Sequence, residues 1–393
     1  MHTLEFAAEK DFTELTDTAN RIFTGKQENG TFTYNQHFFQ EIMPKLYRDP
    51  ASAKEHLVIR DDGRITGLVG VVRNRLYACG QALHAAGIGT VGTDANFRGR
   101  GYMSEMMRAA VAYMKKENVD VAFLGGSRQR YEHFGFTAAG LCAVFELTKQ
   151  NLKDSQGRQR AAQYGFYQME GCGSDAERML IGRLHKQKAL YSERMTRKLA
   201  DILHTWGNQV FLITREAAPV GYLVGRDDGI CELETEAGCS LCEILYDYMH
   251  AFDKNHLTVH GIGLYDTEKI TALSRRAEDM ALRNPCRALI LNFTNVLSAL
   301  LNVKSRDTKL CDGIMSVRVL SDGAAEQFRI TVEDGKPAVH PCGGTPDLEI
   351  SALDAAQLFC GLGSSFANLG YRLPACANGW FPLPLHIESV DMV

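Results

Sequence analysis

A short basic, glycine-rich segment carries the strongest chemical signal in this 393-residue sequence. It reads Arg98-Gly99-Arg100-Gly101 and precedes an apolar pattern of helical period that starts at Tyr102. The first amides of a helix lack intrahelical acceptors and can bind an anion, and glycine lets a ligand approach the backbone. Two arginines add positive charge beside that anion. The segment predicts a pyrophosphate-sized anion site, with an ordinary strand-to-helix turn as the alternative.

The spacing of this segment excludes two common phosphate-binding turns. A P-loop needs Gly-x-x-x-x-Gly-Lys-Ser/Thr, which is absent here, and a dinucleotide turn needs a third glycine where this chain has Ser104. A second polar segment follows an apolar run at 119–124 that is typical of a buried strand. It begins Gly125-Gly126-Ser127 and continues through Tyr131 to Gly135-Phe136.

Together the two segments resemble the GNAT acetyltransferase superfamily. That superfamily carries Arg/Gln-x-x-Gly-x-Gly/Ala at a pyrophosphate turn and, further along, a tyrosine in a Phe-Tyr-x-x-x-Gly-Phe-like motif. Met103 departs from the small residue expected after the turn. In this the chain is similar to acetyltransferases of the enhanced intracellular survival (Eis) type, which have a larger apolar residue there. Acetyl-CoA is therefore the expected cosubstrate.

The resemblance implies a role for each matching residue. Tyr131 would be the general acid that protonates the leaving thiolate, and a phenol with an ordinary pKa near 10 suits that task. The alternative for Tyr131 is a packing aromatic beside Phe134 and Phe136. The cofactor-binding residues would be Val91, Gly92 and Thr93 along the pantetheine arm, Arg98, Gly99, Arg100, Gly101, Tyr102, Met103 and Ser104 around the pyrophosphate, and Gly126 and Ser127 at the thioester.

A general base is also required, because an ammonium cannot attack a thioester. In Eis-like enzymes the terminal carboxylate of the chain performs this role, and the matching group here is the α-carboxylate of Val393. The tail 381–393 is apolar enough to be buried, although it lacks the aromatic end associated with the family. Glu388 and Asp391 are fallback bases, with solvated surface acids as the alternative. His84 and His133 are expected to be structural or surface residues.

The Eis-like resemblance also accounts for the rest of the chain. It implies an α/β (α+β) fold with a catalytic GNAT domain at 1–150, a degenerate second GNAT-like domain at 151–283, and a sterol-carrier-protein-like domain at 284–393. No second copy of the Arg-Gly-Arg-Gly segment occurs in the middle region. The polar stretch 151–165 is expected to be a linker. The tail of the last domain would reach back into the active site.

Hydrophobic periodicity predicts the elements that must position these residues. The expected helices are 11–23, 38–46, 102–117, 176–200, 241–252, 295–302 and 352–359. The expected strands are 56–60, 65–72, 76–79, 82–86, 87–93, 119–124, 210–214, 220–224, 230–233, 257–260, 288–293, 313–320, 327–332, 336–340 and 348–350.

Composition narrows the class of protein. A net charge of −4, without a dense basic run, argues against a nucleic-acid partner. No signal peptide and no membrane-length apolar stretch are visible, so a cytoplasmic location away from membranes is expected. Eleven scattered cysteines do not resemble a disulfide framework. The pair Cys239 and Cys242 has no matching second pair or histidines, so no metal site is expected.

The expected activity is direct transfer of acetyl from acetyl-CoA to a primary amine in a ternary complex. Acceptors of the aminoglycoside or polyamine type, or a protein lysine, remain open, and the segment 25–34 is one candidate for the acceptor pocket. A carrier of lipid or apolar ligands that uses the last domain is an alternative, as is a catalytically inactive scaffold. The resemblance further implies a homo-oligomer, with a hexamer as one candidate.

Overall fold

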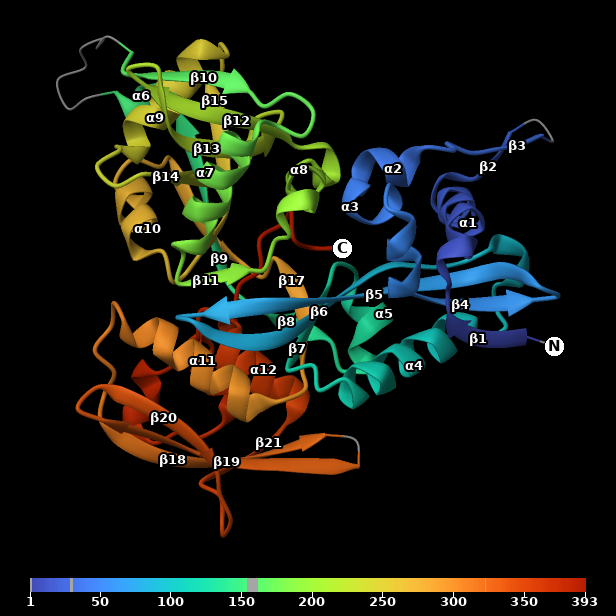
Figure 1. Ribbon diagram of the computed structural model, residues 1–393. Coiled ribbons are helices and arrows are strands. Elements are labelled where there is room, and N and C mark those ends of the chain that lie inside the picture. Colours follow the sequence, from blue (N-terminus) through green and yellow to red (C-terminus); the bar gives the residue numbers. More distant parts are fainter. Residues whose placement is uncertain (1, 29–30, 154–161, 322) are drawn as a thin grey trace.

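The computed structural model describes residues 2–28, 31–153, 162–321 and 323–393. Part of the expected linker, 154–161, lies outside these residues. Within them the strands form sheets of eight, seven and four strands and a separate hairpin of β2 (Lys26–Glu28) and β3 (Thr31–Thr33). Figure 1 shows the three larger sheets around a central meeting point where the chain ends. The mixed α/β fold that the sequence predicts is confirmed.

The first sheet contains the long hairpin that carries the candidate site. Seven of its strands, in spatial order, are β1 (His2–Phe6), β4 (His56–Asp61), β5 (Arg64–Ala78), β6 (Gln81–Thr93), β7 (Val121–Leu124), β17 (Cys286–Ile290) and β8 (Thr137–Ala139). The eighth, β11 (Leu190–Ser192), pairs with β5 outside this order. The strand pairs expected at 65–79 and 82–93 are each one continuous strand. Helix α1 (Phe12–Thr24) and helix α4 (Tyr102–Lys116) contact β5 and β6.

Helix α4 follows from its sequence pattern. Met106, Met107, Ala110 and Met114 recur at helical spacing and are fully buried against the sheet. Its expected range, 102–117, is confirmed within one residue. The expected helix 38–46 is instead two short helices, α2 (Phe38–Ile42) and α3 (Pro44–Tyr47). They separate at Met43 because Pro44 disfavours a helical conformation of the preceding residue and begins the next helix.

Two strands next to the expected domain boundaries lie in a different sheet from the one that those boundaries predict. Strand β9 (Cys142–Thr148) belongs to the second sheet, although it precedes residue 150. Strand β17 follows residue 283 but lies in the first sheet, between β7 and β8. The division of the chain into domains at residues 150 and 283 stays a prediction. The strands are not grouped into sheets along these boundaries. The first sheet is therefore complete only when the third region of the chain is present.

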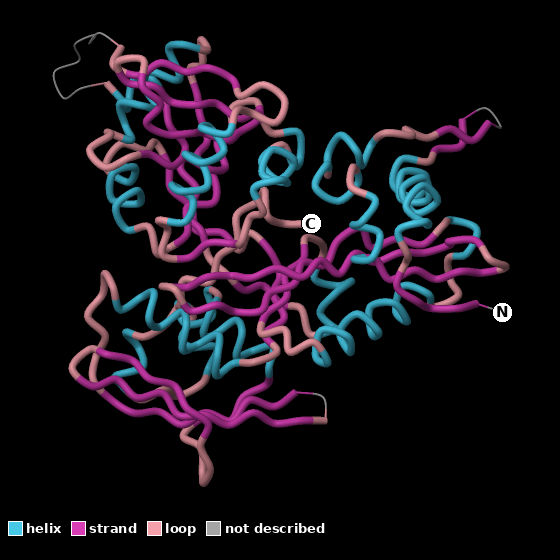
Figure 2. The backbone as a smooth tube through the Cα atoms, viewed as in Figure 1, coloured by secondary structure: helices cyan, strands magenta, loops and turns pink. Residues whose placement is uncertain are grey.

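The second sheet forms the upper body in Figures 1 and 2. Its order is β10 (Tyr164–Gln168), β12 (Gln209–Arg215), β13 (Ala218–Arg226), β14 (Gly229–Thr235), β15 (His256–Gly263), β9 and β16 (Asp279–Arg283). Its helices are α6 (Lys149–Leu152), α7 (Asp175–Lys186), α8 (Leu199–Leu203), α9 (Leu241–Ala251) and α10 (Thr267–Ser274). The expected strands and the helix at 241–252 are confirmed.

The single helix expected at 176–200 is wrong. Helix α7 (Asp175–Lys186) begins at a capping box formed by Ser174 and Glu177, and it ends at Lys186. The following strand β11 (Leu190–Ser192) pairs with β5 of the first sheet, and the short helix α8 (Leu199–Leu203) comes next. Pairing with a distant strand has overridden the local helical preference.

The third region packs a sheet against two helices. The sheet order is β20 (Lys336–Pro341), β19 (Ala324–Glu333), β18 (Gly313–Ser321) and β21 (Leu348–Ser351). Helices α11 (Phe293–Ser305) and α12 (Ala352–Cys360) lie between this sheet and the β5–β6 hairpin (Figure 1). One continuous apolar core joins them, with Phe328, Phe359 and Trp380 fully buried within it.

We expect the N-terminal sheet to depend on β17. Ending the chain after Arg283 would leave β7 and β8 without the strand that separates them and would expose the core around Ala288. The truncated chain should lose the cooperative thermal unfolding of the full chain, as measured by near-ultraviolet circular dichroism. A cooperative transition at the temperature of the full chain would contradict this dependence.

Candidate active site

The site begins where two parallel strands separate. Strands β6 and β7 pair in parallel from Ala85 opposite Val121 to Ile88 opposite Leu124, where β7 ends. Strand β6 continues to Thr93, and beyond Ile88 no described strand pairs with its edge on the β7 side. Backbone groups there are open to an extended ligand that carries amides, because unpaired strand edges are templates for pairing.

A bulge shapes β6 at this point. The pairing with β5 shifts between Gly89 and Gly92, and Thr90 has a positive φ of 48°. Such bulges bend a strand and redirect its groups beside functional sites. The expected pantetheine-binding residues, Val91, Gly92 and Thr93, follow this bulge. Gly92 has a second role, because a Cβ there would come within 2.8 Å of Ile22 on α1.

The glycine-rich turn has the geometry of an anion site. Gly99 and Gly101 have φ of 78° and 81°, and a Cβ on either would meet no atom within 4 Å. Gly101 is the N-cap of α4, and no side chain caps the helix. The first amides of α4, including those of Met103 and Ser104, are therefore left for another acceptor. The backbone fits a pyrophosphate.

The side chains of this turn divide into two groups. Arg100 pairs with Asp61 at 2.9 Å, and the Tyr102 hydroxyl donates to the same carboxylate at 2.7 Å. The hydrogen bond from Tyr102 is the main cause that holds the pKa of Asp61 below its usual value, and the positive charge of Arg100 acts in the same direction. Arg98 is exposed, with Nε 3.4 Å from the Thr93 carbonyl. Arg98 is thus the freer cation, while Arg100 is held by the β4–β5 hairpin.

Tyr131 ends the short helix α5 (Arg128–Tyr131) and is buried. Gly126 has φ of 138°, and a Cβ on it would lie 2.5 Å from Cε2 of Tyr131. The glycine is therefore required by the tyrosine ring. The Gly126 carbonyl accepts from Nε of Arg287 at 2.8 Å, which joins this loop to β17. Burial raises the pKa of Tyr131, with Arg130 opposing, so the phenol stays protonated near neutral pH.

Tyr131 and the chain terminus line one cavity of about 230 Å³. Its remaining lining comes from residues 88–91 of β6, Gly125, Phe39 and Met43 of the α2–α3 region, Trp206 and Met392. The structure thus brings Tyr131, Val91 and Val393 together. Gly126 and Ser127 are outside the lining, to which the neighbouring Gly125 belongs.

The terminal residue lies directly on β6. A Cβ on Gly87 would be 2.5 Å from Cγ2 of Val393, and one on Gly89 would be 2.5 Å from its carboxyl carbon. Both glycines therefore make room for the chain end. Sequence reasoning missed these two residues. The available signal was the recurrence of glycine at 87, 89 and 92 in one predicted strand, since glycine in a strand often marks the close approach of another backbone or a ligand.

Backbone hydrogen bonds hold the tail from the N-terminal side. Lys45 is buried, and its Nζ donates to the carbonyls of Val390 at 2.6 Å and Met392 at 2.5 Å. Burial lowers the pKa of Lys45 to about 7. From the opposite side the Trp206 indole donates to the Ser389 carbonyl at 3.2 Å. The tail is therefore held between α3 and the part of the chain built on the second sheet, which we call the second body.

Buried ion pairs also hold the side chains of the tail. Arg194 binds Asp391 and Glu232, each at 2.8 Å, and Lys188 binds Glu388 at 2.9 Å. We call Arg194, Glu232, Asp391, Lys188 and Glu388 the anchor cluster. Burial alone would raise the pKa of Glu232, but Arg194 and Lys188 hold it well below its usual range. Asp391 and Glu388 are outside the lining of the Tyr131 cavity, so neither gains support as a base.

The remaining sequence candidates lie elsewhere. His84 is exposed on β6, and His133 is exposed with its ring 4.0 Å from that of Phe134. Neither lines the cavity. Cys242 bonds to the Ala272 carbonyl, and Cys239 packs against the second core. Within the described residues no group of three metal-ligating side chains is assembled, and no helix has the length and apolarity to cross a bilayer.

Comparison with known proteins agrees with this geometry. Residues 4–139 match the acetyltransferase (GNAT) domain family. This part of the chain is therefore similar to GNAT acetyltransferase domains. It contains the glycine-rich turn, the β6–β7 divergence and Tyr131, so the match covers most of the candidate site. No curated protein matches the sequence significantly.

Solved structures resemble the whole chain in fold. A GCN5-related N-acetyltransferase from Anabaena variabilis superposes with a TM-score of 0.69 at 15% identity. A probable N-acyltransferase from Enterococcus faecalis has a TM-score of 0.69 at 16% identity, and Eis1 from Mycobacterium abscessus has 0.66 at 12% identity. Each match covers 100% of both chains. The arrangement of all three sheets is therefore shared with these proteins.

We expect the loss of one member of the anchor cluster to destabilise the folded chain. Arg194→Met would leave Glu232 and Asp391 buried without their common partner, and such losses cost roughly 3–5 kcal/mol. Denaturant unfolding should show a decrease of this size, with Arg215→Met, an exposed arginine of β12, as the matched control. A decrease no larger than that of the control would contradict the role of Arg194.

The same cluster sets a dependence on pH. The pKa values of Glu232 and Glu388 are lowered in the folded state, against an unfolded value of about 4.3. Their contribution is therefore fully present above that value and is lost as the pH falls through the folded pKa values. The free energy of unfolding should decrease below about pH 4.3, and less steeply in Arg194→Met.

Proposed function

We propose that the chain is an acetyl-CoA-dependent N-acetyltransferase that acetylates a primary amine of a small molecule by direct transfer. The observation that supports this most is the presence of Tyr131 and the Val393 terminus in one cavity, at the divergence of β6 and β7. These two groups are a protonated acid and a carboxylate. Acetyl transfer to an ammonium-bearing acceptor requires both.

The cosubstrate would lie along β6. The unpaired edge of Val91, Gly92 and Thr93 would pair with the amides of its arm, and the first turn of α4, with Arg98, would hold its pyrophosphate. When bound, acetyl-CoA supplies an activated acetyl thioester. The protein's contribution is to hold that ligand and the acceptor together, which removes most of the entropic cost of their encounter.

The terminal carboxylate of Val393 would act as the base. No ion pair to this carboxylate occurs among the residues that the structure describes, so it is available to the amine. It would accept a proton from the acceptor's ammonium, directly or through a water molecule, and so deliver the neutral nucleophile. Its position depends on Lys45, Trp206 and the anchor cluster, which together hold the five preceding residues, 388–392.

Tyr131 would supply the proton for the departing thiolate. Its raised pKa keeps the hydroxyl protonated when the reaction begins. A cysteine relay receives no support, because none of the cysteines in the described part of the chain lines the cavity. Carriage of an apolar ligand by the third region receives none either, because Phe328, Phe359 and Trp380 fill its interior. The sterol-carrier likeness and the homo-oligomer remain predictions.

The role of Tyr131 can be tested by removing only its hydroxyl. Tyr131→Phe should lower kcat about 100- to 10,000-fold, the usual range for loss of a general acid, with acetyl-CoA affinity unchanged. Thiol release with a panel of amines measures the rate, and calorimetry measures binding. Tyr113→Phe, on α4 outside the cavity, is the matched control. Undiminished kcat in Tyr131→Phe would remove this residue from the mechanism.

The role of the chain end can be tested by extension. One glycine added after Val393 moves the carboxylate by about 3.5 Å and leaves every side chain in place. We expect kcat to fall about 100-fold while the thermal midpoint stays unchanged, because the added residue touches no part of the anchor cluster. An extended protein with full activity would exclude the terminal carboxylate as base.

A further inference from the structure

We infer that the acceptor carries a single ammonium on an apolar body, and that Trp206 selects for it. This inference rests on the proposed function and narrows it, since polycations such as aminoglycosides and polyamines would be poor substrates. The relevant observations are the composition of the cavity wall, the pairing of the nearby acids, the size of the cavity and the conformation of Trp206.

The wall of the cavity is apolar. Phe39, Met43, Ile88 and Trp206 supply side chains to it, and Phe39 stands in a cluster of aromatic rings with Phe23 at 5.1 Å, Phe38 at 5.3 Å and Tyr47 at 4.8 Å between centroids. No Asp or Glu side chain belongs to the lining among the described residues. The only acidic group there is the terminal carboxylate of Val393, which would face the reacting amine.

A second ammonium would therefore find no partner. Burial of an unpaired cation costs several kcal/mol, whereas burial of an apolar body in such a wall is favourable. Two acids between the N-terminal region and the second body are already paired with cations. Asp49 pairs with Lys198 at 3.1 Å, and Asp201 pairs with Arg48 at 3.2 Å, both at the junction of α3 and α8.

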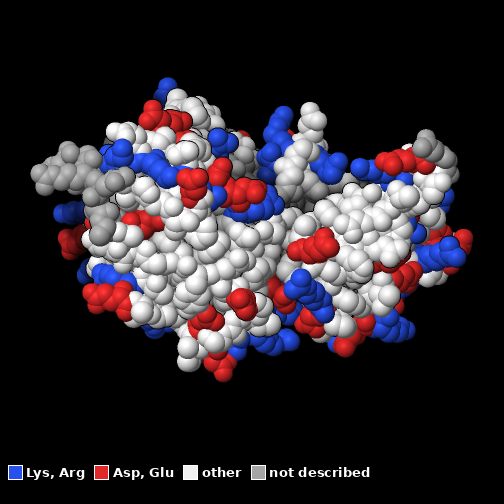
Figure 3. Space-filling view, turned by 90° about the horizontal axis from the view of Figure 1, so that it is seen from above, with Lys and Arg blue, Asp and Glu red and all other residues white. Residues whose placement is uncertain are grey.

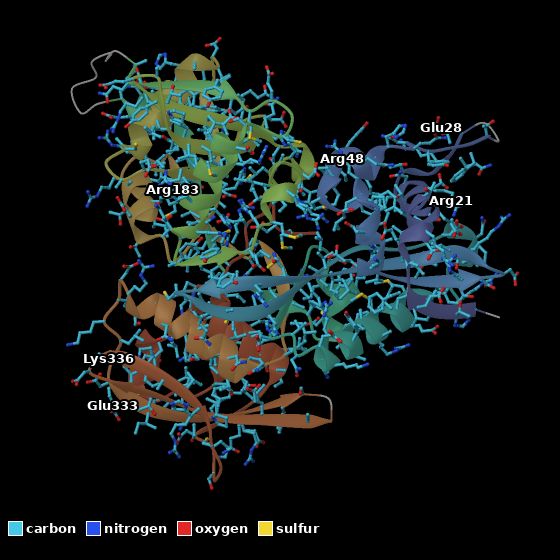
Figure 4. The ribbon with its side chains drawn as sticks, viewed as in Figure 1. Arg21, Glu28, Arg48, Arg183, Glu333 and Lys336 are labelled. Carbon is cyan, nitrogen blue, oxygen red and sulfur yellow. The ribbon has the colours of Figure 1, made fainter. Side chains whose placement is uncertain are left out.

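Figures 3 and 4 place these charges. Figure 3 shows acidic and basic side chains interspersed on the face where the two bodies meet, and Figure 4 shows Arg48 at the edge of α3 that faces α8. Behind the tail, Lys45 adds a buried cation that would repel a second ammonium when it is protonated. The volume of about 230 Å³ is also below the roughly 300–1,000 Å³ typical of sites for larger ligands.

Trp206 is the residue that the second body contributes to this wall. Its backbone has φ of 66°, a left-handed conformation that is rare and strained for a bulky residue. Contacts at both ends hold it there, since Arg226 donates to its carbonyl at 2.6 Å and its indole donates to Ser389. A half-buried aromatic face is thereby fixed against the acceptor space.

A matched pair of amines tests the inference directly. Hexylamine and 1,6-diaminohexane have the same chain and differ in the number of cations. We expect kcat/KM for hexylamine to exceed that for the diamine by roughly tenfold or more, because the second ammonium would stay unpaired. Spermidine and an aminoglycoside, included in the panel, should be weaker still, and 2-phenylethylamine should be stronger.

The outcomes separate the two proposals. Preference for the diamine, spermidine or the aminoglycoside would overturn the single-cation inference and leave the acetyltransferase standing. Absence of acetylation with every amine would overturn the proposed function, and the inference with it.

Variants of Trp206 test its part in the selection. Trp206→Ala should reduce the ratio of kcat/KM between hexylamine and the diamine, and Trp206→Glu should reduce it further, by about tenfold, because it adds a second acid. The ratio is internal to each variant, so partial loss of folded protein cancels. Phe366→Ala, an exposed aromatic of the third region, is the control. A ratio unchanged by both Trp206 variants would overturn the assignment of Trp206.

Discussion

The buried pairing of Arg194 with Asp391 and Glu232 is the interaction on which the site depends. A terminal segment of a chain ordinarily frays, because few contacts offset its conformational entropy. Here the last six residues carry two side-chain carboxylates, Glu388 and Asp391, which pair with Lys188 and Arg194. A buried ion pair contributes little net stability against an apolar substitute, but it tolerates little displacement once formed. The anchor cluster therefore fixes position more than it adds stability.

That fixed position makes the candidate site composite. The N-terminal sheet supplies the open edge of β6, the turn before α4 and Tyr131. The second body supplies Trp206 and the cations of the anchor cluster, and the third region supplies β17 and the terminus. The backbone joins the same three parts, because β9, β11 and β17 each pair within a sheet that belongs mainly to another region of the chain. The domain that contains the family motif is thus neither a complete sheet nor a complete site by itself.

The sequence could predict what is local and could not predict what is brought together by distant contacts. The turn at Arg98–Gly101 and the loop at Tyr131 are recognisable because motif, strand and helix are adjacent in the chain. Lys45 could not be identified, because its partners are the carbonyls of Val390 and Met392, which have no sequence signal. The wrong helix at 176–200 has the same cause, since β11 exists only through its pairing with β5.

The choice of a chain end as the base has a physical consequence for specificity. A base on a side chain would place its carboxylate in the cavity wall. Single substitutions of neighbouring residues could then add further acids beside it. A terminal carboxylate occurs once, and its place on Gly87 and Gly89 needs a close-packed, apolar approach. The neighbouring acids of the tail are paired with Arg194 and Lys188, and these ion pairs hold the tail in place. The same interactions that position the base therefore withdraw every other negative charge of the tail from the acceptor, which leaves a wall suited to apolar contact and one cation.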